Sequence, residues 1–309
     1  MKKRILVIVG PTATGKSDLA VFLAKKLGGE IVSADSRQVY KGLDIGTGKV
    51  PRDPTRSTLH AGRFMYRGIP HHLLDIVNPK RVFTVSQYKK LGEKALQDIW
   101  WRGKLPIICG GTGFYIQALV DGIILPEVPP NKKLRKQLEK KSVTELFAIL
   151  KKLDPRRAKE IDRKNHRRLI RAVEIAKYLG KVPRLKVQAP KNTDILQIGI
   201  DMPDKILKER IEKRLKVRIK KGMIQEAVHL HHQGVSWRRM EELGLEYRYL
   251  ARYLEKKITK KQMTDELAQA IWKYAKRQRT WFKRDKRIKW FKPEQKKRIE
   301  KLAGKFLNK

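Results

Sequence analysis

The chain has 309 residues, enough for one large domain or two smaller ones, and hydrophobic residues make up 40% of it, which supports a globular core. Its 74 lysines and arginines outnumber its 31 aspartates and glutamates, giving a net charge of +43. This balance argues against an enzyme that handles only small uncharged substrates, because a strongly positive surface attracts polyanions such as nucleic acids. The alternative explanation is a generally lysine-rich proteome.

The positive charge is uneven, with +14 in residues 1–150 and +29 in residues 151–309. Cys109 is the only cysteine, which excludes a disulfide framework and a cysteine-based zinc site and fits a reducing compartment. No stretch approaches the roughly 18 apolar residues of a membrane span. The apolar run near the start ends at Gly10 and is too short for a signal peptide. We therefore expect a soluble cytoplasmic protein.

In chain order, the first predicted element is a strand over residues 4–9, an apolar run rich in β-branched residues that is typical of a strand buried on both faces. A turn over residues 10–15 follows. A helix is then predicted from Ser17, with apolar residues at helical spacing until Gly28 closes it. Residues 30–33 predict a second strand. This order of strand, turn, helix and strand predicts a parallel sheet covered by helices.

Two further buried strands are predicted over residues 105–109 and 194–200, and the chain between them becomes helical and polar. We therefore expect an α/β core of residues 1–122 and 191–309, interrupted by a helical insertion over residues 123–190. Helical patterns dense in Lys and Arg follow residue 204. The lysine-rich tail from about residue 286 is expected to be partly disordered.

Residues 10–17 read GPTATGKS and match the pattern G-x-x-x-x-G-K-[ST] between a predicted strand and a predicted helix. Glycines let the backbone wrap a phosphate, and the free N–H groups at the start of a helix point toward it. Lys16 adds a positive charge, and the Ser17 hydroxyl is a ligand for Mg²⁺. The pattern predicts a phosphate or diphosphate site and a P-loop-type parallel sheet flanked by helices.

The phosphate loop alone leaves kinase, ATPase and other diphosphate chemistry open. A typical nucleoside triphosphatase adds a strand that ends in an aspartate for magnesium, whereas the strand over residues 105–109 ends in glycines. Asp35 follows the strand over residues 30–33 and is a candidate general base or metal ligand; the alternative is an aspartate that caps the next helix. Because ligands bind beyond the carboxyl ends of parallel strands, the segments at Gly10, Asp35 and Gly110 are expected to border one crevice.

Seven motifs in order make the chain resemble the tRNA dimethylallyltransferase (isopentenyl-tRNA transferase) family over about residues 5 to 285. They read GPTATGKS, DSRQVYKGLDIGTGK, HHLLDI, GGTGFYIQALVDG, RRLIRAVEI, RIEKRLKVRIKKGMIQEA and AKRQRTWFKRD. The resemblance implies a bacterial-type enzyme that transfers a dimethylallyl group from dimethylallyl diphosphate to the exocyclic amine of the adenine 3′ of the anticodon. It also implies that the phosphate loop, with magnesium, holds the isoprenoid diphosphate and not ATP.

For catalysis, the resemblance implies that Asp35 is the general base, while Lys16 and the loop amides stabilise the leaving diphosphate. Arg210 and Arg214 lie four residues apart on one face of a predicted helix. The resemblance implies that one of them reaches the diphosphate, and the alternative is a solvated basic face. The residues assigned to the diphosphate are Gly10, Pro11, Thr12, Ala13, Thr14, Gly15, Lys16 and Ser17.

The target adenine is stacked in the RNA and must be flipped out before an enclosed site modifies it. Cations and aromatics are mixed over residues 273–282, which suits RNA binding, and the apolar residues there also suit packing on the core, so a dual role is expected. The residues assigned to RNA binding are Asp35, Ser36, Arg37, Gln38, Thr112, Arg135, Arg167, Arg168, Leu169, Ile170, Arg171, Arg277 and Gln278.

Two other classes of protein remain as alternatives. A small-molecule kinase with the same phosphate loop would explain residues 10–17 but not the charge of residues 151–309. An ATP-dependent RNA-binding protein would explain the charge but not the segments around Asp35 and residues 110–113. The chain also departs from the family at Arg218, where methionine is common. A monomeric tRNA-modifying transferase is the leading hypothesis.

Overall fold

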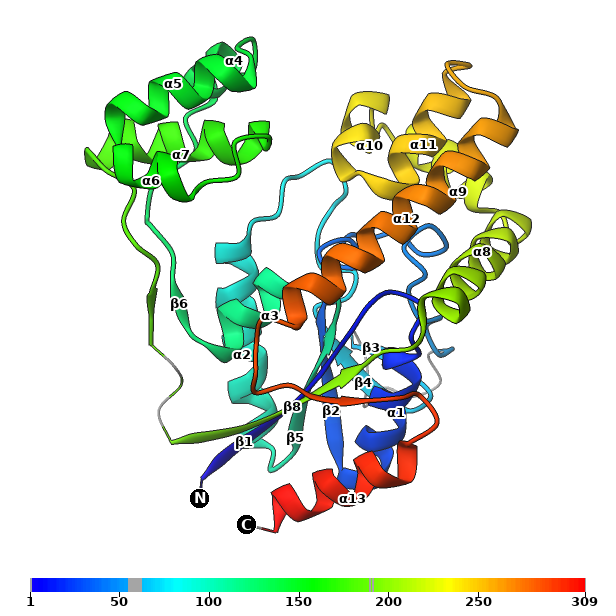
Figure 1. Ribbon diagram of the computed structural model, residues 1–309. Coiled ribbons are helices and arrows are strands. Elements are labelled where there is room, and N and C mark those ends of the chain that lie inside the picture. Colours follow the sequence, from blue (N-terminus) through cyan, green and yellow to red (C-terminus); the bar gives the residue numbers. More distant parts are fainter. Residues whose placement is uncertain (1, 55–62, 189, 191, 309) are drawn as a thin grey trace. The chain divides into compact units, whose positions relative to one another are not determined.

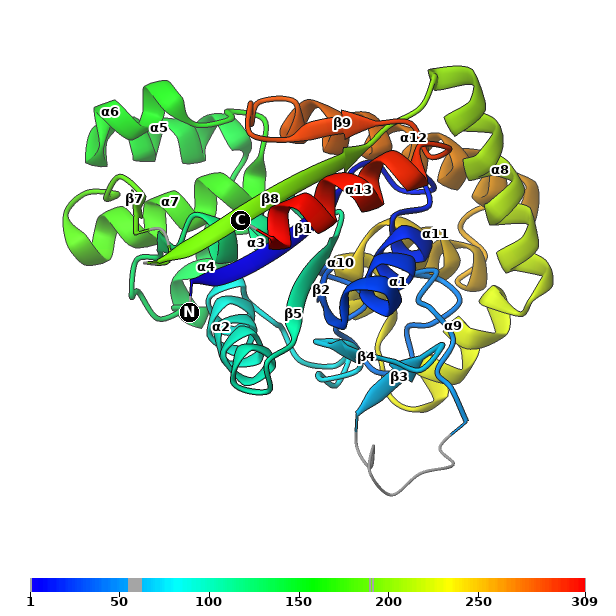
Figure 2. The same cartoon turned by 90° about the horizontal axis from the view of Figure 1, so that it is seen from below.

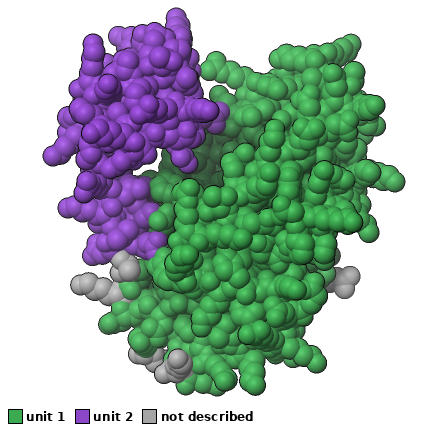
Figure 3. All heavy atoms as spheres, viewed as in Figure 1, with its two compact units in different colours: residues 1–120, 190–309 green, residues 121–189 purple. Residues whose placement is uncertain are grey.

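The computed structural model describes residues 2–54, 63–188, 190 and 192–308, and the chain divides into two compact units (Figure 3). Unit 1 comprises residues 1–120 and 190–309, and unit 2 comprises residues 121–189. These limits lie within two residues of the boundaries expected from the sequence.

Unit 1 is built on a sheet that has seven strands within the described residues, in the order β3-β4-β2-β5-β1-β8-β9 (Figure 1). Neighbouring strands pair in parallel except β3 and β4, which are antiparallel. The strands are β1 (Lys3–Val9), β2 (Gly29–Ala34), β3 (Phe64–Tyr66), β4 (Ile69–His72), β5 (Leu105–Gly110), β8 (Thr193–Ile200) and β9 (Lys289–Phe291). The helices of unit 1 are α1 (Lys16–Leu27), α2 (Val85–Trp101), α3 (Gly113–Val120), α8 (Asp204–Lys220), α9 (Met223–His232), α10 (Trp237–Leu243), α11 (Leu245–Leu254), α12 (Lys260–Phe282) and α13 (Lys296–Leu307).

Strand β1 runs through the centre of the core and is buried on both faces. Ile5, Val7 and Val9 pack with α2 and α3, whereas Leu6 and Ile8 pack with α1 and α13. This alternation is the two-residue period of a strand, and burial on both faces explains why the sequence run is continuously apolar. The mixed α/β fold with a mostly parallel sheet confirms the predicted fold class, and the four strands predicted from the sequence appear as β1, β2, β5 and β8.

A third hydrophobic cluster contains side chains from the five helices α8, α9, α10, α11 and α12 and from the segment that follows β2. Val39, Tyr40 and Leu43 from that segment are buried among side chains from these five helices. The helices therefore lie over the end of the sheet where the parallel strands finish (Figure 1). Helices α8 to α12, which follow residue 203, thus cover the end of the sheet next to the phosphate loop.

Residues 287–308 contain strand β9 and helix α13, and the expectation of a partly disordered tail was wrong. Strand β9 pairs in parallel with β8, and α13 follows it beside the sheet (Figure 2). Ile299 and Ala303 of α13 are buried against the α1 face of the sheet. The Arg4 guanidinium also donates to the carbonyl oxygen of Leu307 at 2.6 Å. The lysines of this tail face outward from an amphipathic helix, so composition alone suggested disorder where a stripe of apolar residues packs.

Unit 2 is a small helical unit with its own core. Its helices are α4 (Lys132–Leu138), α5 (Val143–Leu153), α6 (Pro155–Glu160) and α7 (His166–Leu179), and a short ribbon pairs β6 (Ile123–Ile124) with β7 (Lys186–Val187). Ser142, Asp154 and Asn165 cap α5, α6 and α7 through their side chains. The core gathers residues such as Leu146, Leu150 and those of α7.

None of the helices within the described residues combines the length and apolar character that crossing a bilayer requires.

Candidate active site

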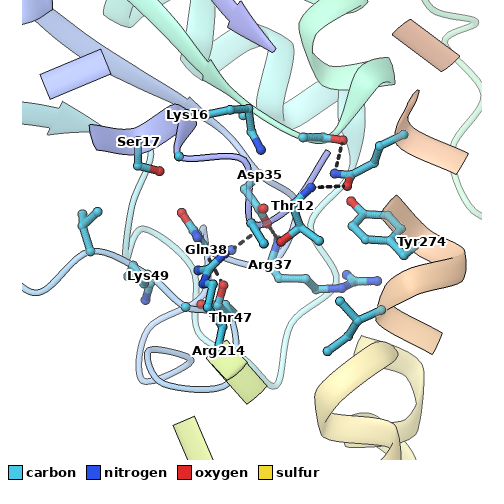
Figure 4. A pocket seen from close by; sticks show the side chains of 18 of the residues that line it. Thr12, Lys16, Ser17, Asp35, Arg37, Gln38, Thr47, Lys49, Arg214 and Tyr274 are labelled. Atoms are coloured by element: carbon cyan, nitrogen blue, oxygen red, sulfur yellow. Dashed lines mark hydrogen bonds between the residues drawn. The ribbon is translucent and has the colours of Figure 1, made fainter. Parts of the chain in front are cut away.

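The loops that follow β1, β2 and β5 border one cavity of about 510 Å³ in unit 1 (Figure 4). Strand β5 pairs in parallel with both β1 and β2, so the three strands end at the same edge of the sheet. They bring Lys16, Asp35 and Gly111 to the lining of one cavity. The expected convergence of the segments after these strands is therefore confirmed. The remaining walls come from residues 47–51 and from α8, α11 and α12.

The backbone of the phosphate loop requires its glycines. A Cβ atom at Gly10 would lie 2.2 Å from the carbonyl oxygen of Ile200, and Gly15 has a φ of +87°. Within the loop, the Thr14 hydroxyl donates to the carbonyl oxygen of Pro11 at 2.9 Å. Gly15 caps α1 without a side-chain hydrogen bond. The first amides of α1 are therefore available to an anion held in the loop.

Lys16 carries the positive charge of this loop. Its ammonium donates to the carbonyl oxygen of Pro11 at 2.5 Å. Burial lowers the pKa of Lys16 to about 8; Cys109 and Asp35 oppose this shift, and Arg214 reinforces it. Burial also raises the pKa of the Cys109 thiol to about 12, so it is protonated at neutral pH. An anion bound in the loop would favour the charged form of Lys16.

Asp35 has one carboxylate oxygen engaged by the local backbone. Its Oδ1 accepts hydrogen bonds from the amides of Arg37 at 2.8 Å and Gln38 at 3.3 Å. The next amide back, that of Ser36, donates to Thr112 Oγ1 at 3.0 Å. The alternative considered for Asp35, a capping aspartate, thus holds for Oδ1, which caps a turn and not a helix. Within the described part of the chain Oδ2 accepts no hydrogen bond, and Asp35 lines the cavity.

The loop over residues 44–46, which leads into the cavity lining at residues 47–51, depends on a residue that sequence analysis did not identify. Glu226 of α9 accepts hydrogen bonds from the amides of Asp44, Ile45 and Gly46 at 3.0, 2.6 and 2.9 Å. Tyr247 of α11 donates its hydroxyl to Glu226 at 2.7 Å. Three successive amides form an anion-binding concavity, but nothing in the sequence of this loop indicates which carboxylate, some 180 residues away, fills it.

Lys49 holds the other end of the same loop. Its side chain is buried, and its ammonium donates to Tyr40 O at 3.0 Å, to Asp44 at 2.6 Å and to Asp75. Asp75 belongs to the HHLLDI motif, so this lysine joins two sequence motifs that the fold brings together. Lys49 is therefore fixed by three acceptors, although it also lines the cavity.

Helix α8 supplies the cationic side of the cavity. Arg210, Lys213 and Arg214 all line it, so both predicted arginines lie at the site. Desolvation lowers the pKa of Arg214, and the neighbouring Arg218 lowers it further. Arg218 itself donates to the carbonyl oxygen of Gly46 at 2.5 Å and to Glu246 at 3.0 Å. The departure from the family at Arg218 is thus accommodated by an ion pair, and Arg214 is left beside the cavity with a charge that an anion would balance.

Helix α12 reaches the cavity through Tyr274 and Gln278. The Tyr274 side chain lies beside Thr112, and burial raises the pKa of Tyr274. Gln278 is only 5% exposed. Its Oε1 accepts from the amide of Thr12 at 2.8 Å, and its Nε2 donates to the carbonyl oxygen of Gly111 at 2.9 Å. Gln278 was predicted to contact RNA, but it bonds the protein's own loops; the neighbouring Arg277 is exposed.

The predicted RNA contacts of unit 2 differ in accessibility. Leu169 and Ile170 are buried in the core of the unit, which closes their side chains to RNA, and we reassign both to packing. Arg135 and Arg171 both bind the buried carboxylate of Glu174. Arg167 and Arg168 are exposed on α7. The alternation follows from the helical period, which turns neighbours in the sequence toward opposite sides.

Two protein families match this chain. The family described as IPP transferase matches residues 38–285, and the family described as Isopentenyl transferase matches residues 3–67. Among individual proteins, the chain is 45% identical over 287 residues to tRNA dimethylallyltransferase 2 of Treponema denticola, covering 92% of each sequence. It is 43% identical over 285 residues to tRNA dimethylallyltransferase 1 of Geotalea daltonii, covering 92% of this chain and 87% of the relative.

Solved structures agree with these sequence matches. The tRNA isopentenylpyrophosphate transferase from Bacillus halodurans superposes with a TM-score of 0.71 at 33% identity, covering 100% of this chain and 97% of the other. A eukaryotic dimethylallyltransferase solved while acting on tRNA superposes with a TM-score of 0.71 at 25% identity, covering 94% of this chain and 74% of the other.

Proposed function

Because the chain belongs to the IPP transferase family, we propose that it transfers a dimethylallyl group from dimethylallyl diphosphate to the exocyclic amine of an adenine in tRNA. The acceptor is the adenine 3′ of the anticodon, and the products are N6-(dimethylallyl)adenosine and diphosphate. One observation carries the proposal: the phosphate loop and Asp35 line the same cavity. A binding loop for the leaving diphosphate and a carboxylate that can accept the amine proton therefore lie in one cavity.

In this reaction the bond between C1 of the dimethylallyl group and a diphosphate oxygen breaks, and a bond between C1 and N6 of adenine forms. The amine must lose a proton as the new bond forms, because a neutral product cannot keep the ammonium charge. Asp35 Oδ2 would take that proton, while Oδ1 stays with the amides of Arg37 and Gln38. Fixing one oxygen orients the other.

Negative charge grows on the diphosphate as the carbon–oxygen bond breaks, and preorganised donors lower the free energy of that charge. The amides at the start of α1 and the ammonium of Lys16 lie on one side of the cavity, and Arg210 and Arg214 line it as well. The desolvation that lowers the pKa of Arg214 makes its charge costly without a partner. A diphosphate would balance that charge, which supports the assignment of α8 to the leaving group.

Magnesium fits this site as an ion shared with the substrate. Ser17 is exposed at the start of α1 and lines the cavity with Asp18 and Asp35. Magnesium typically takes one or two protein ligands together with phosphate oxygens and waters, so a hydroxyl beside a diphosphate meets its needs. Ser17 would hold the ion, and the ion would neutralise charge on the diphosphate when bound.

An adenine that enters the cavity has to leave its stack in the RNA. Asp35, Arg37, Gln38 and Tyr274 line the cavity, and a flipped base would sit there between the donor and Asp35. Thr112 lies behind this lining, where its hydroxyl accepts from the amide of Ser36. The exposed Arg277 on α12 and the exposed Arg167 and Arg168 on α7 are suited to the phosphates of the RNA backbone. The net charge of +43 supports a polyanionic acceptor.

The two alternatives, a small-molecule kinase and an ATP-dependent RNA-binding protein, are not favoured. Relatives above 40% identity over more than nine-tenths of the chain carry the name tRNA dimethylallyltransferase. A small-molecule kinase would also not explain the net positive charge of residues 151–309.

The deciding experiment incubates the purified protein with magnesium and either dimethylallyl diphosphate or ATP, each with and without tRNA. We expect diphosphate release only with dimethylallyl diphosphate and tRNA together, and mass spectrometry of the digested tRNA should show an adenosine heavier by one dimethylallyl group. The Lys16→Met variant serves as the control for loss of the phosphate site. Rapid ATP hydrolysis with no change in the tRNA nucleosides would reject the proposal in favour of the alternatives.

A further inference from the structure

A single helix, α12, contacts the loops after β1 and β5, and the loop after β5 in turn bonds the loop after β2. Gln278 bonds the loop after β1 through the amide of Thr12 and the loop after β5 through the carbonyl of Gly111. The side chain of Tyr274, one turn earlier, lies beside Thr112, whose hydroxyl accepts from the amide of Ser36 after β2. Helix α12 is therefore linked to the part of the cavity that would bind phosphate and to the part that holds Asp35.

The helix approaches these loops so closely that their glycines are required by the contact. A Cβ atom at Gly111 would lie 2.1 Å from Gln278 Nε2, and one at Gly113 would lie 2.2 Å from the Trp281 ring. At such distances a side chain at Gly111 would displace the Gln278 amide, and one at Gly113 would displace the Trp281 ring. The absence of side chains at Gly111 and Gly113 thus leaves room for α12 to pack against this segment. Both polar atoms of the Gln278 side chain form hydrogen bonds with backbone groups.

We infer that Gln278 is a positioning residue for the phosphate loop and not an RNA contact. The residue is only 5% exposed, and its Oε1 and Nε2 each have a backbone partner. The two bonds fix the distance between the phosphate loop and residues 110–113, which sets where the loop amides and Lys16 stand. This inference rests on the proposed function, because it assigns Gln278 to the diphosphate half of that site.

The test uses Gln278→Met, which keeps a side chain of similar length and removes both hydrogen bonds. Binding of inorganic diphosphate with magnesium is measured by calorimetry, and binding of tRNA is measured separately without the donor. Losing hydrogen bonds worth about 1.4 kcal/mol corresponds to about tenfold weaker diphosphate binding, and tRNA affinity should stay within about twofold of the unaltered protein. The control is Gln269→Met, an exposed glutamine on the same helix, which should change neither affinity.

A second variant keeps the test decisive if Gln278→Met unfolds on a thermal scan. In Gln278→Glu, the protonated carboxyl can still accept from Thr12 and donate to Gly111, whereas the ionised form places an oxygen against the Gly111 carbonyl and cannot donate. The diphosphate affinity of Q278E relative to the unaltered protein should therefore improve as the pH falls from 8 to 5.5. A ratio that does not change with pH would overturn the positioning role.

Diphosphate binding needs no prenyl transfer, so this test separates the two proposals. Weaker diphosphate binding by Q278M in a protein that transfers nothing to tRNA would keep the positioning role and reject the proposed function. Normal diphosphate binding with a loss of tRNA affinity would identify Gln278 as an RNA contact and overturn the inference, whatever the transferase activity.

Discussion

The hydroxyl of Tyr247 lies 2.7 Å from the carboxylate of Glu226 and donates a hydrogen bond to it. Glu226 uses the same carboxylate to accept hydrogen bonds from the amides of residues 44–46, so the two side chains together support the loop that leads into the cavity lining at residues 47–51. Gly46 makes this arrangement possible, because a Cβ there would lie 2.7 Å from the Tyr247 ring. A loop that lines the cavity is thus shaped by two helices from the far part of the chain.

Replacing Glu226 should destabilise the protein more than replacing Tyr247. Glu226→Ala leaves three amides without their charged acceptor and is expected to cost about 3 kcal/mol in the free energy of unfolding, against about 1 kcal/mol for Tyr247→Phe. Because the two side chains share one hydrogen bond, the double variant should lose less than the two single variants added together. Chemical denaturation measures all three, and strict additivity would contradict the shared role.

Replacing Asp35 should slow the chemical step without weakening RNA binding. Asp35→Asn keeps an oxygen that can accept from the amides of Arg37 and Gln38, so the turn after β2 should be retained while the base is lost. We expect transfer to fall by about 100-fold or more, the scale for loss of a general base. Single-turnover kinetics give the rate and filter binding gives the tRNA affinity.

The comparison with Asp35→Ala separates catalysis from structure. The alanine variant removes the acceptor of the turn as well as the base, so it should also lower the melting temperature. A collapse of tRNA affinity in Asp35→Asn, with the rate on bound tRNA unchanged, would make Asp35 a binding residue only.

Diphosphate affinity should fall as the pH rises through about 8. Burial lowers the pKa of Lys16 from its ordinary value of 10.5 to about 8, so the lysine is mostly charged at pH 7 and loses its proton over pH 8 to 9. A bound anion needs the charged form, so binding must take up a proton at higher pH, and affinity then declines by up to about tenfold per pH unit. Titration of magnesium diphosphate at several pH values measures this decline.

Lys16→Arg is the matched control for that titration, because arginine stays charged throughout this range. The ionisation of the diphosphate itself affects both proteins equally, so the ratio of their affinities isolates Lys16. Parallel curves for the two proteins would show that deprotonation of Lys16 does not govern binding.

Affinity for tRNA should depend steeply on salt. A protein that neutralises six or more phosphates loses on the order of 1,000-fold in affinity between 50 and 200 mM salt. Replacing the exposed Arg167 and Arg168 with glutamine should reduce the slope of log affinity against log salt by about two. The same change at Arg298, exposed on α13, is the control and should leave the slope unchanged. A flat salt profile in the unaltered protein would contradict binding through its basic surface.

The elements that local patterns specify were predictable. Continuous apolar runs marked β1, β2, β5 and β8, and helical spacing with a closing glycine marked α1, whose cap Gly28 has a φ of +64°. Strands β3, β4 and β9 are three or four residues long. Such short segments carry too little periodicity to be distinguished from loops, and they exist because neighbouring strands supply their hydrogen bonds.

The sequence by itself determined the chemistry of the phosphate loop and the set of parallel strands, because a loop of eight residues and a run of apolar side chains are local properties. Only the tertiary structure decided which residues support the site. Gln278 meets Thr12 across 266 positions of the chain, and Glu226 meets Asp44 across 182. Pairings of this kind arise when separate elements pack on a common core, and no pattern within either segment encodes the partner.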